Sequence, residues 1–152
     1  MTQAFLDANV FIYATGRPHP LKQPCVEILA LATRHTLTFL TDAEVLQELL
    51  HRLMALRLWA NDGRARFWDY AELMEGRAEP MTAADVQEAA RMADKHSGLS
   101  SRDLVHLAVM HRLEVTHIVT ADRTFDQVGD VTRLDPAEVA SWGPALVSES
   151  NT

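Results

Sequence analysis

Apolar residues occur in short runs along this chain of 152 residues, separated by segments rich in charged residues, proline or glycine. Short runs with β-branched or aromatic side chains are typical of buried strands, whereas apolar positions three and four apart are typical of amphipathic helices. We therefore expect strands over residues 5–6, with the apolar residues 10–13 as the exit of that strand, and over 36–40, 117–121 and 131–134. These strands are short and largely apolar, so they are expected inside the molecule.

Helices are predicted between these strands, because residues that favour helix starts precede several amphipathic segments. Thr41 and Glu44 have the spacing of a capping box, in which each side chain accepts a hydrogen bond from the backbone of the other residue. Ser100 and Asp103 have the related pattern, and Asp135 supplies an N-cap before a proline. The predicted helices cover residues 25–33, 41–58, 64–74, 82–96 and 100–112, with a closing helix after residue 136.

The order of these elements indicates an α/β domain with a central, mostly parallel sheet flanked by helices. The length suits one domain, and no linker or internal repeat divides it. We assign residues 1–147 to this single domain and 148–152 to a flexible tail. Ligands of such folds bind beyond the carboxyl ends of the strands, so polar residues at those ends are the first candidates for a functional site.

Composition and charge narrow the classes of protein that fit. The chain has 47% hydrophobic and 23% charged residues, as is ordinary for a globular protein. The single cysteine, Cys25, excludes an intrachain disulfide, and no secretory signal or membrane-spanning run is visible, so a cytoplasmic protein is expected. The net charge of −7 argues against indiscriminate binding of nucleic acids but leaves room for a local basic groove.

Two acids stand where predicted strands end. Asp7 lies in an apolar segment, where a carboxylate without a partner is costly to bury, so we favour a functional role over an Asx-turn with Asn9. Asp122 follows the strand over 117–121, and the Thr120 hydroxyl is spaced to orient it. Asp126 is the alternative, and we favour Asp122 because it is closer to the strand end.

Three further acids lie on predicted helices. Glu44 and Glu48 are four residues apart and share a face. Glu44 has a sufficient structural role as a capping acid, whereas Glu48 lies beside the apolar stripe, so we favour Glu48 as a site residue. Asp103 has two interpretations of equal weight: a capping acid, or a site residue at the start of a very apolar and therefore central helix.

The acids Asp7, Glu48, Asp103 and Asp122 would repel one another if they met at one rim, and a hard divalent cation such as Mg²⁺ or Mn²⁺ is the usual remedy. Zinc is not indicated, because the histidines show no ligand spacing, and His106 is expected to be a packed or partly exposed helix residue. A carboxylate-bound ion can activate water and assist displacement at phosphorus, so hydrolysis of a phosphodiester is the expected reaction. Motifs for a serine nucleophile or a phosphate-binding loop are absent.

Four segments occur in the order and spacing of a PIN domain, and from Asp7 to about Asp135 the chain resembles the VapC-like toxins of bacterial toxin–antitoxin systems. The segments are FLDANVFIY, DAEVLQELLHR, LSSRDLVHLAVM and IVTADRTFDQV. The resemblance implies a Rossmann-like, three-layer fold and an endoribonuclease that uses Mg²⁺ or Mn²⁺ to cleave RNA. It also implies a homodimer, and a cognate antitoxin that inhibits the enzyme by laying a helix or extended segment into a groove.

Carried over residue by residue, the resemblance assigns metal binding and catalysis to the same acids and a supporting role to their neighbours. The matching acids are Asp7, Glu48, Asp103 and Asp122. Asn9 and Thr120 are the supporting residues, and Phe125 is the motif neighbour of Asp122. Many members carry a second acid just before the phenylalanine of the last motif, where this chain has Thr124. The fourth acid therefore stays open between Asp122 and Asp126, and Glu44 stays a second candidate beside Glu48.

Residues 49–70 carry more large apolar side chains than one face of two helices needs for a core. A well-packed helical hairpin and an antitoxin groove explain this excess equally well. Arginines in the same region would contact RNA or acidic antitoxin residues, or be solvated. The apolar side chains are Leu49, Leu50, Leu53, Met54, Leu56, Leu58, Trp59, Phe67, Trp68 and Tyr70, and the arginines are Arg52, Arg57, Arg64 and Arg66.

Two other functions compete with an RNA-cleaving toxin. A phosphatase of the haloacid-dehalogenase type also begins with an acid after a strand, but it requires Asp-x-Asp, and here Asn9 stands two residues after Asp7. A catalytically inactive PIN-like module that only binds RNA or protein is the stronger alternative. Such modules usually lose one or more of the acids, and here all four positions are occupied.

Overall fold

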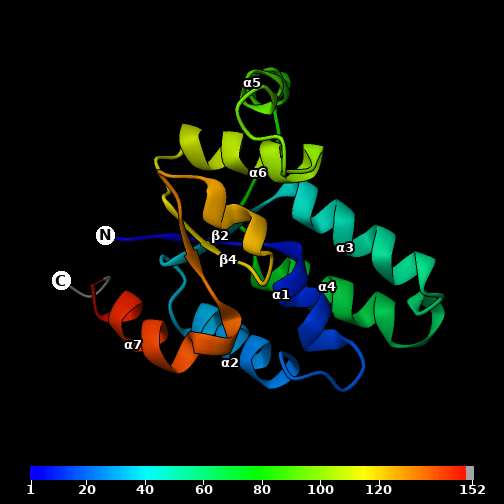
Figure 1. The fold of residues 1–152 in the computed structure, drawn as a ribbon. Helices are drawn as coiled ribbons and strands as arrows, with labels where there is room; N and C mark the ends of the chain where they lie inside the picture. The colour runs from blue at the N-terminus through cyan, green and yellow to red at the C-terminus, as the bar shows by residue number, and fades with distance from the viewer. Residues whose placement is uncertain (150–152) are drawn as a thin grey trace.

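Five short strands form one sheet in which every neighbouring pair is parallel, as the computed structural model shows for residues 1–149 (Figure 1). The strand order is β3-β2-β1-β4-β5. The strands are β1 (Ala4–Leu6), β2 (Phe39–Asp42), β3 (Ala78–Glu79), β4 (His117–Val119) and β5 (Thr132–Leu134). The predicted α/β class with a mostly parallel sheet is confirmed, and the carboxyl ends of β2, β1 and β4 lie side by side.

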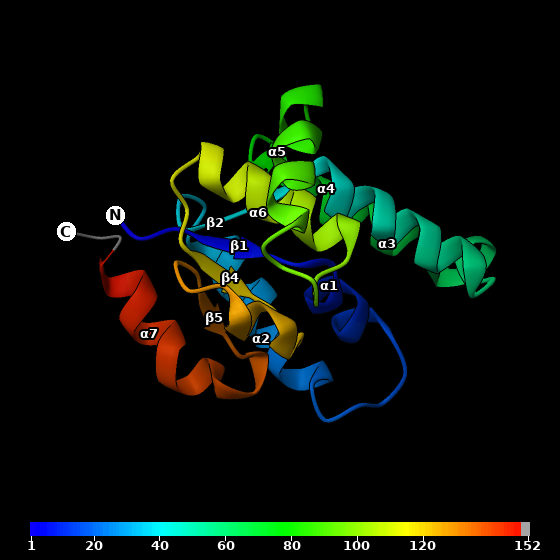
Figure 2. The ribbon, with the colours of Figure 1, turned by 45° about the horizontal axis from the view of Figure 1, so that its top comes forward.

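Helices cover both faces of the sheet and give the expected three layers. The helices are α1 (Ala8–Thr15), α2 (Lys22–Arg34), α3 (Ala43–Ala55), α4 (Arg64–Leu73), α5 (Ala83–Ala93), α6 (Ser101–Arg112) and α7 (Val139–Glu149). One face is covered by α2 and α7, and the other by α6, with α5 packed on its outer side (Figures 1 and 2). Helix α3 contacts α1 and α6 and extends beyond the carboxyl ends of the strands (Figure 2).

The central strand β1 and the central helix α6 build the core. All three residues of β1 are fully buried, and they pair with β2 on one side and β4 on the other. Helix α6 is buried without a break over residues 104–110. The prediction that the apolar helix after Ser100 is central is therefore confirmed, and its start opens near the strand ends.

The segment after β1 differs from the predicted strand exit, because it forms helix α1. Asp7 is the N-cap of this helix, and its Oδ1 accepts a hydrogen bond from the Ala8 N–H at 2.8 Å. Val10 and Phe11 are buried, and one turn of helix places both against the core. The apolar run was therefore correctly placed inside the molecule, but its conformation was wrong.

The start of α3 also differs from the predicted capping box. Strand β2 runs through Asp42, so Thr41 belongs to the sheet, where its hydroxyl donates to the Leu6 carbonyl at 2.8 Å. Asp42 takes the N-cap position instead, and its Oδ1 accepts from the Val45 N–H at 2.9 Å. Glu44 is thereby released from the capping role that the sequence pattern had assigned to it.

Smaller differences concern the ends of elements. Helix α3 ends at Ala55, and a π-helical turn, Trp59–Gly63, joins it to α4. Strand β3 was not predicted, because its two half-buried residues carry no periodicity. Helix α7 includes Ser148 and Glu149, two residues that the sequence had assigned to the tail. The remaining tail, 150–152, lies outside the described residues.

No helix in the described part of the chain combines the length and the apolar character needed to cross a membrane.

Candidate active site

Asp7 is held at the centre of the site by three hydrogen bonds. It follows β1, and its side chain is almost fully buried. Besides the bond from Ala8 to Oδ1, its Oδ2 accepts from the Thr120 hydroxyl at 2.8 Å and from Asn9 Nδ2 at 3.3 Å. Burial raises the pKa of Asp7, against the lowering by the charge of His106 and by the hydrogen bonds from Thr120 and Ala8. An ionised Asp7 is thus costly unless a positive charge lies beside it.

Asn9 and Thr120 tie the start of α1 to the end of β4. Asn9 Nδ2 donates to Thr120 Oγ1 at 2.9 Å, and Asn9 Oδ1 accepts from the Ala121 N–H at 3.3 Å. Thr120 Oγ1 also accepts from the Asp122 N–H at 3.0 Å. Because Thr120 is fully buried, this hydroxyl is a fixed junction between Asp7 and the segment that carries Asp122.

Asp122 and Asp126 occupy different surroundings. Asp122 caps the short 3₁₀ turn Arg123–Gln127 by accepting from the N–H and hydroxyl of Thr124, and it lines a surface hollow together with Glu48 and Asp103. Asp126 is about half exposed and pairs with Arg133 at 2.9 Å, away from that hollow. Of the two alternatives that the sequence left open, the geometry favours Asp122.

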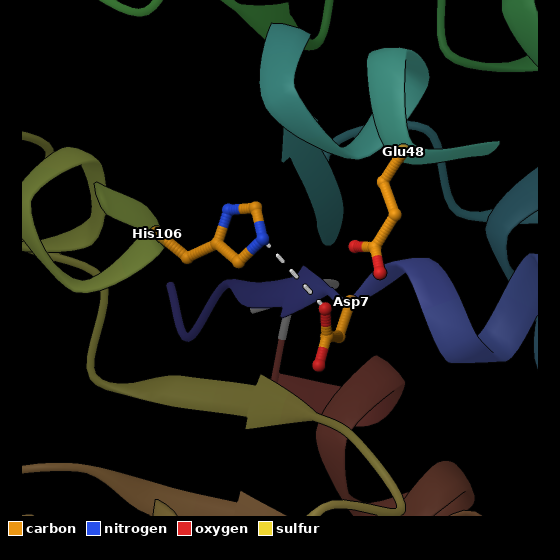
Figure 3. Close-up of side chains that lie close together, drawn as sticks. All are labelled: Asp7, Glu48 and His106. Atoms are coloured by element: carbon orange, nitrogen blue, oxygen red, sulfur yellow. Dashed lines mark ion pairs between the residues drawn. The ribbon is translucent and has the colours of Figure 1, made fainter. Parts of the chain in front are cut away.

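Glu48 projects from α3 toward Asp7, as Figure 3 shows. Arg102 reaches both glutamates of this helix, with Nε at 3.4 Å from Glu44 Oε1 and Nη1 at 3.6 Å from Glu48 Oε1. Glu48, unlike Glu44, places a carboxylate oxygen within 4.8 Å of both Asp7 and His106. The preference for Glu48 therefore agrees with the geometry, and Glu44 is its neighbour across Arg102.

Asp103 is a capping acid, and it also lines the hollow at the carboxyl ends of the strands. It forms a reciprocal capping box with Ser100, in which its Oδ2 accepts from the Ser100 N–H and its own N–H donates to Ser100 Oγ, both at 3.2 Å. It also lines the hollow with Glu48 and Asp122, and its charge raises the pKa of both Asp7 and His106. Capping positions this acid at the rim of the site.

His106 is the residue of the cluster whose surroundings the sequence did not indicate. It is fully buried on α6, and its Nδ1 lies 2.7 Å from Oδ2 of Asp42, another buried acid. Its Nε2 faces Asp7 Oδ1 across 3.8 Å (Figure 3). Burial alone would lower the pKa of His106, but the hydrogen bond and charge of Asp42, with the charges of Asp7 and Asp103, outweigh it and raise the pKa to about 9.

The donor set fits a divalent cation. Asp7, Glu48 and His106 each offer a ligand atom, and these atoms lie within 4.8 Å of one another. Oxygen donors from carboxylates suit Mg²⁺ and Mn²⁺, and an imidazole adds affinity for transition metals. Burial raises the pKa of Asp7, so positive charge beside this carboxyl is stabilising, and Nε2 of His106 makes no hydrogen bond within the described part of the protein.

Sequence comparison places the chain among known proteins. The family profile of the PIN domain matches residues 4–131. Ribonuclease VapC23 of Mycobacterium tuberculosis is 42% identical over 123 residues, which span 79% of this chain and 93% of that protein. Ribonuclease VapC13 of the same organism is 31% identical over 129 residues, which span 85% of this chain and 97% of that protein.

Solved structures agree with the fold. A FitAB structure bound to an IR36 DNA fragment superimposes with a TM-score of 0.65 at 18% identity, covering 89% of this chain and 96% of the other. FitAcB from Neisseria gonorrhoeae gives a TM-score of 0.61 at 21% identity, covering 88% and 98%. The site, the sequence relatives and the fold lead to one conclusion: the chain belongs to the PIN-domain family, and its relatives within that family are VapC proteins.

Proposed function

We propose that this protein is an endoribonuclease that depends on Mg²⁺ or Mn²⁺ and acts as the toxin of a toxin–antitoxin pair. The observation that carries the proposal is that Glu48 belongs to two acidic groups at the carboxyl ends of a parallel sheet. It lies in the cluster with Asp7 and His106, and it lines the hollow with Asp103 and Asp122. Relatives named ribonucleases, which align over nearly their whole length, support RNA as the substrate.

The four acids would have different roles at the metal site. Asp7 and Glu48 would hold the ion, with Asp103 and Asp122 supplying negative charge on the adjacent wall of the hollow. When bound, such an ion lowers the pKa of a water molecule and offsets the charge that develops at phosphorus. Thr120 fixes the Asp7 carboxylate by its hydrogen bond. Arg102, whose side chain is 42% exposed beside Glu48, would contact a phosphate of the RNA.

The experiment uses the two glutamates that share Arg102. Protein stripped with EDTA is supplied with Mg²⁺ or Mn²⁺ and incubated with an end-labelled RNA pool, and Glu48→Gln is compared with its matched control, Glu44→Gln. We expect cleavage to need the ion, to fall at least tenfold in Glu48→Gln, and to persist in Glu44→Gln. Wild-type protein that leaves RNA intact with both ions would favour the alternative of an inactive binding module.

An apolar groove supports the antitoxin part of the proposal. The groove lies between α1 and the end of α3 with its π-helical turn, and Ile12, Leu53, Leu56 and Leu58 line it. Leu56 is 54% exposed, whereas Leu53 is buried and belongs to the core. The excess of apolar side chains noted in the sequence thus divides between core packing and an open groove. Homodimerisation stays a prediction from the resemblance, and a cytoplasmic location stays a prediction from the composition of the sequence.

The groove can be tested with one matched pair of variants. Leu56→Glu places a charge in the groove, whereas Leu37→Glu places the same charge at another exposed leucine, which lines a different hollow. The probe is the protein encoded by a short reading frame beside this gene. We expect Leu56→Glu alone to weaken its binding by tenfold or more in calorimetry. Equal binding by both variants would contradict this placement of the antitoxin.

A further inference from the structure

His106 carries a buried polar atom that makes no hydrogen bond within the described part of the protein. The residue is fully buried, and its ring packs on Phe5 with centroids 5.2 Å apart. Buried polar atoms are nearly always hydrogen-bonded. Among the residues that the structure describes, Nε2 of His106 is the buried side-chain nitrogen or oxygen without a hydrogen-bond partner. It faces Asp7 Oδ1 at 3.8 Å, which is too long for a hydrogen bond.

Asp42 fixes which ring nitrogen carries hydrogen. Its Oδ1 is engaged by the Val45 N–H, and its Oδ2 lies 2.7 Å from Nδ1 of His106. A carboxylate accepts and does not donate, so Nδ1 donates the hydrogen. When a metal ion takes the place of a hydrogen on Nε2, the lone pair of that nitrogen is directed at Asp7. A histidine that donates one ring N–H to a carboxylate and leaves the other nitrogen free is the arrangement typical of metal-binding histidines.

We propose that His106 binds the divalent ion through Nε2, together with Asp7 and Glu48, and that Asp42 is the positioning residue that holds the required tautomer. Two atoms that each lie about 2.1 Å from one ion are at most about 4.2 Å apart. The 3.8 Å between Nε2 and Asp7 Oδ1 meets this limit. The inference rests on the metal-dependent function proposed above and extends it to a nitrogen ligand.

A nitrogen ligand has a consequence for the choice of ion. Imidazole suits Mn²⁺ and other transition metals, whereas Mg²⁺ prefers oxygen ligands. We therefore expect the wild-type protein to bind Mn²⁺ more tightly than Mg²⁺. Substituting His106 by Asn removes a direct ligand, so it should weaken binding of Mn²⁺ by at least about 10-fold, the lower end of the cost of losing even a residue that only orients a ligand, and should affect Mg²⁺ less.

The test is pulsed electron paramagnetic resonance of the Mn²⁺-loaded protein, with binding constants from a Mn²⁺ titration. Wild-type protein should show hyperfine coupling to a directly bound nitrogen, which changes to the ¹⁵N pattern when histidine is labelled with ¹⁵N. In His106→Asn this coupling should disappear, although six other histidines stay labelled. Wild-type spectra alone can refute the proposal, so it does not depend on the stability of any variant.

The Asp42→Asn variant tests whether Asp42 positions the His106 ring for metal binding, because the ring itself is still present. The amide introduced by this substitution can still accept from the Val45 N–H with its oxygen, but its own N–H then faces Nδ1 of His106, which must become the acceptor. The hydrogen moves to Nε2, and the nitrogen coupling should be lost although His106 is present. Retained coupling in Asp42→Asn would overturn the positioning role.

The outcomes distinguish this inference from the proposed function. Mn²⁺ that binds with no nitrogen coupling, and with the same affinity in His106→Asn, would refute the histidine ligand and leave the acidic metal site standing. Failure of the wild-type protein to bind Mn²⁺ at all would refute both. Nitrogen coupling that is lost in His106→Asn supports both.

Discussion

Replacing Thr120 by Val tests whether the hydrogen bonds around Asp7 stabilise the fold and orient the Asp7 carboxylate. Valine has nearly the shape of threonine, so the substitution removes the hydroxyl without opening a cavity. That hydroxyl donates to Asp7 Oδ2 at 2.8 Å and accepts from Asn9 Nδ2 at 2.9 Å and from the Asp122 N–H at 3.0 Å. Thr120 is fully buried, so a water molecule has no space to replace it.

The magnitude follows from these three bonds. A hydrogen bond to a charged group contributes about 1.5–3 kcal/mol, and each donor left unsatisfied in a buried position costs a further ~1–3 kcal/mol. The donors of Asn9 and Asp122 are only partly buried, so we expect the free energy of unfolding to fall by about 2–4 kcal/mol. For a chain of this size the melting temperature should fall by roughly 5–15 °C.

Cleavage should fall as well, because the freed Asp7 carboxylate no longer has a fixed orientation. Losing a residue that orients a metal ligand usually costs 10- to 100-fold in metal affinity or activity. The assays are thermal unfolding by circular dichroism and initial rates of RNA cleavage below the melting temperature of every variant.

Two controls accompany this variant. Thr120→Ser keeps the hydroxyl and should retain most of the stability and activity. Thr33→Val removes a hydroxyl that bonds only the Leu29 carbonyl within helix α2, so it should change little. Thr120→Val protein with the melting temperature and cleavage rate of the wild type would refute the reasoning.

Three further predictions concern single groups. Burial raises the pKa of the Cys25 thiol to about 12. Ellman's reagent at pH 8 should therefore label this thiol only after the protein is unfolded in guanidinium. Prompt labelling of the folded protein would contradict the burial of Cys25. The hydrogen bond from Arg112 lowers the pKa of Asp85, so the stabilisation it gives is present at neutral pH and is progressively lost as the pH falls below about 4. Denaturant titrations should show Asp85→Asn less stable than the wild type by about 1.5–3 kcal/mol at pH 7, with the difference narrowing as the pH is lowered below about 4. Arg102 forms a partly exposed ion pair with Glu48 and so competes with a cation for that carboxylate. Arg102→Gln should therefore tighten Mn²⁺ binding about 1.5- to 5-fold in calorimetry. Weaker binding would show that Arg102 helps to build the site.

The hydrophobic pattern of the sequence correctly predicted which segments are buried. The apolar runs of β1 and α6 were correctly placed in the core, and the Ser100–Asp103 capping box was confirmed. Conformation was less certain than burial, because an apolar run as short as that at Val10 and Phe11 packs equally well as strand or helix. Tertiary packing of α1 against α2 and α3 decides between them.

The predicted ends of the strands explain why two acids of the site were found in the sequence and why a third acid, Asp42, was missed. Asp7 and Asp122 were selected because they follow strands, and both lie at the carboxyl edge of the sheet. Asp42 ends β2 in the same way, but the strand was predicted to stop at Leu40, so the rule was not applied to it. Had β2 been extended to Asp42, the same argument would have identified this acid.

His106 and Arg102 were missed for a different reason. Their partners, Asp42 and the two glutamates of α3, are more than 50 residues away in sequence, and only the docking of α6 beside α3 brings them together. A polar ring within the apolar run of α6 was a weak signal in the sequence. Its meaning depends on the acid that faces it, and that contact is not encoded in any local pattern.

Cleavage of a labelled RNA pool by wild-type protein and by Asp7→Asn tests the central claim most directly, with Asp126→Asn as the control acid outside the hollow. The wild type and Asp126→Asn should cleave RNA with Mg²⁺ or Mn²⁺ and stop when EDTA is added, whereas Asp7→Asn should not cleave. Equal cleavage by Asp7→Asn, or cleavage that persists in EDTA, would contradict a nuclease site built on this cluster of acids.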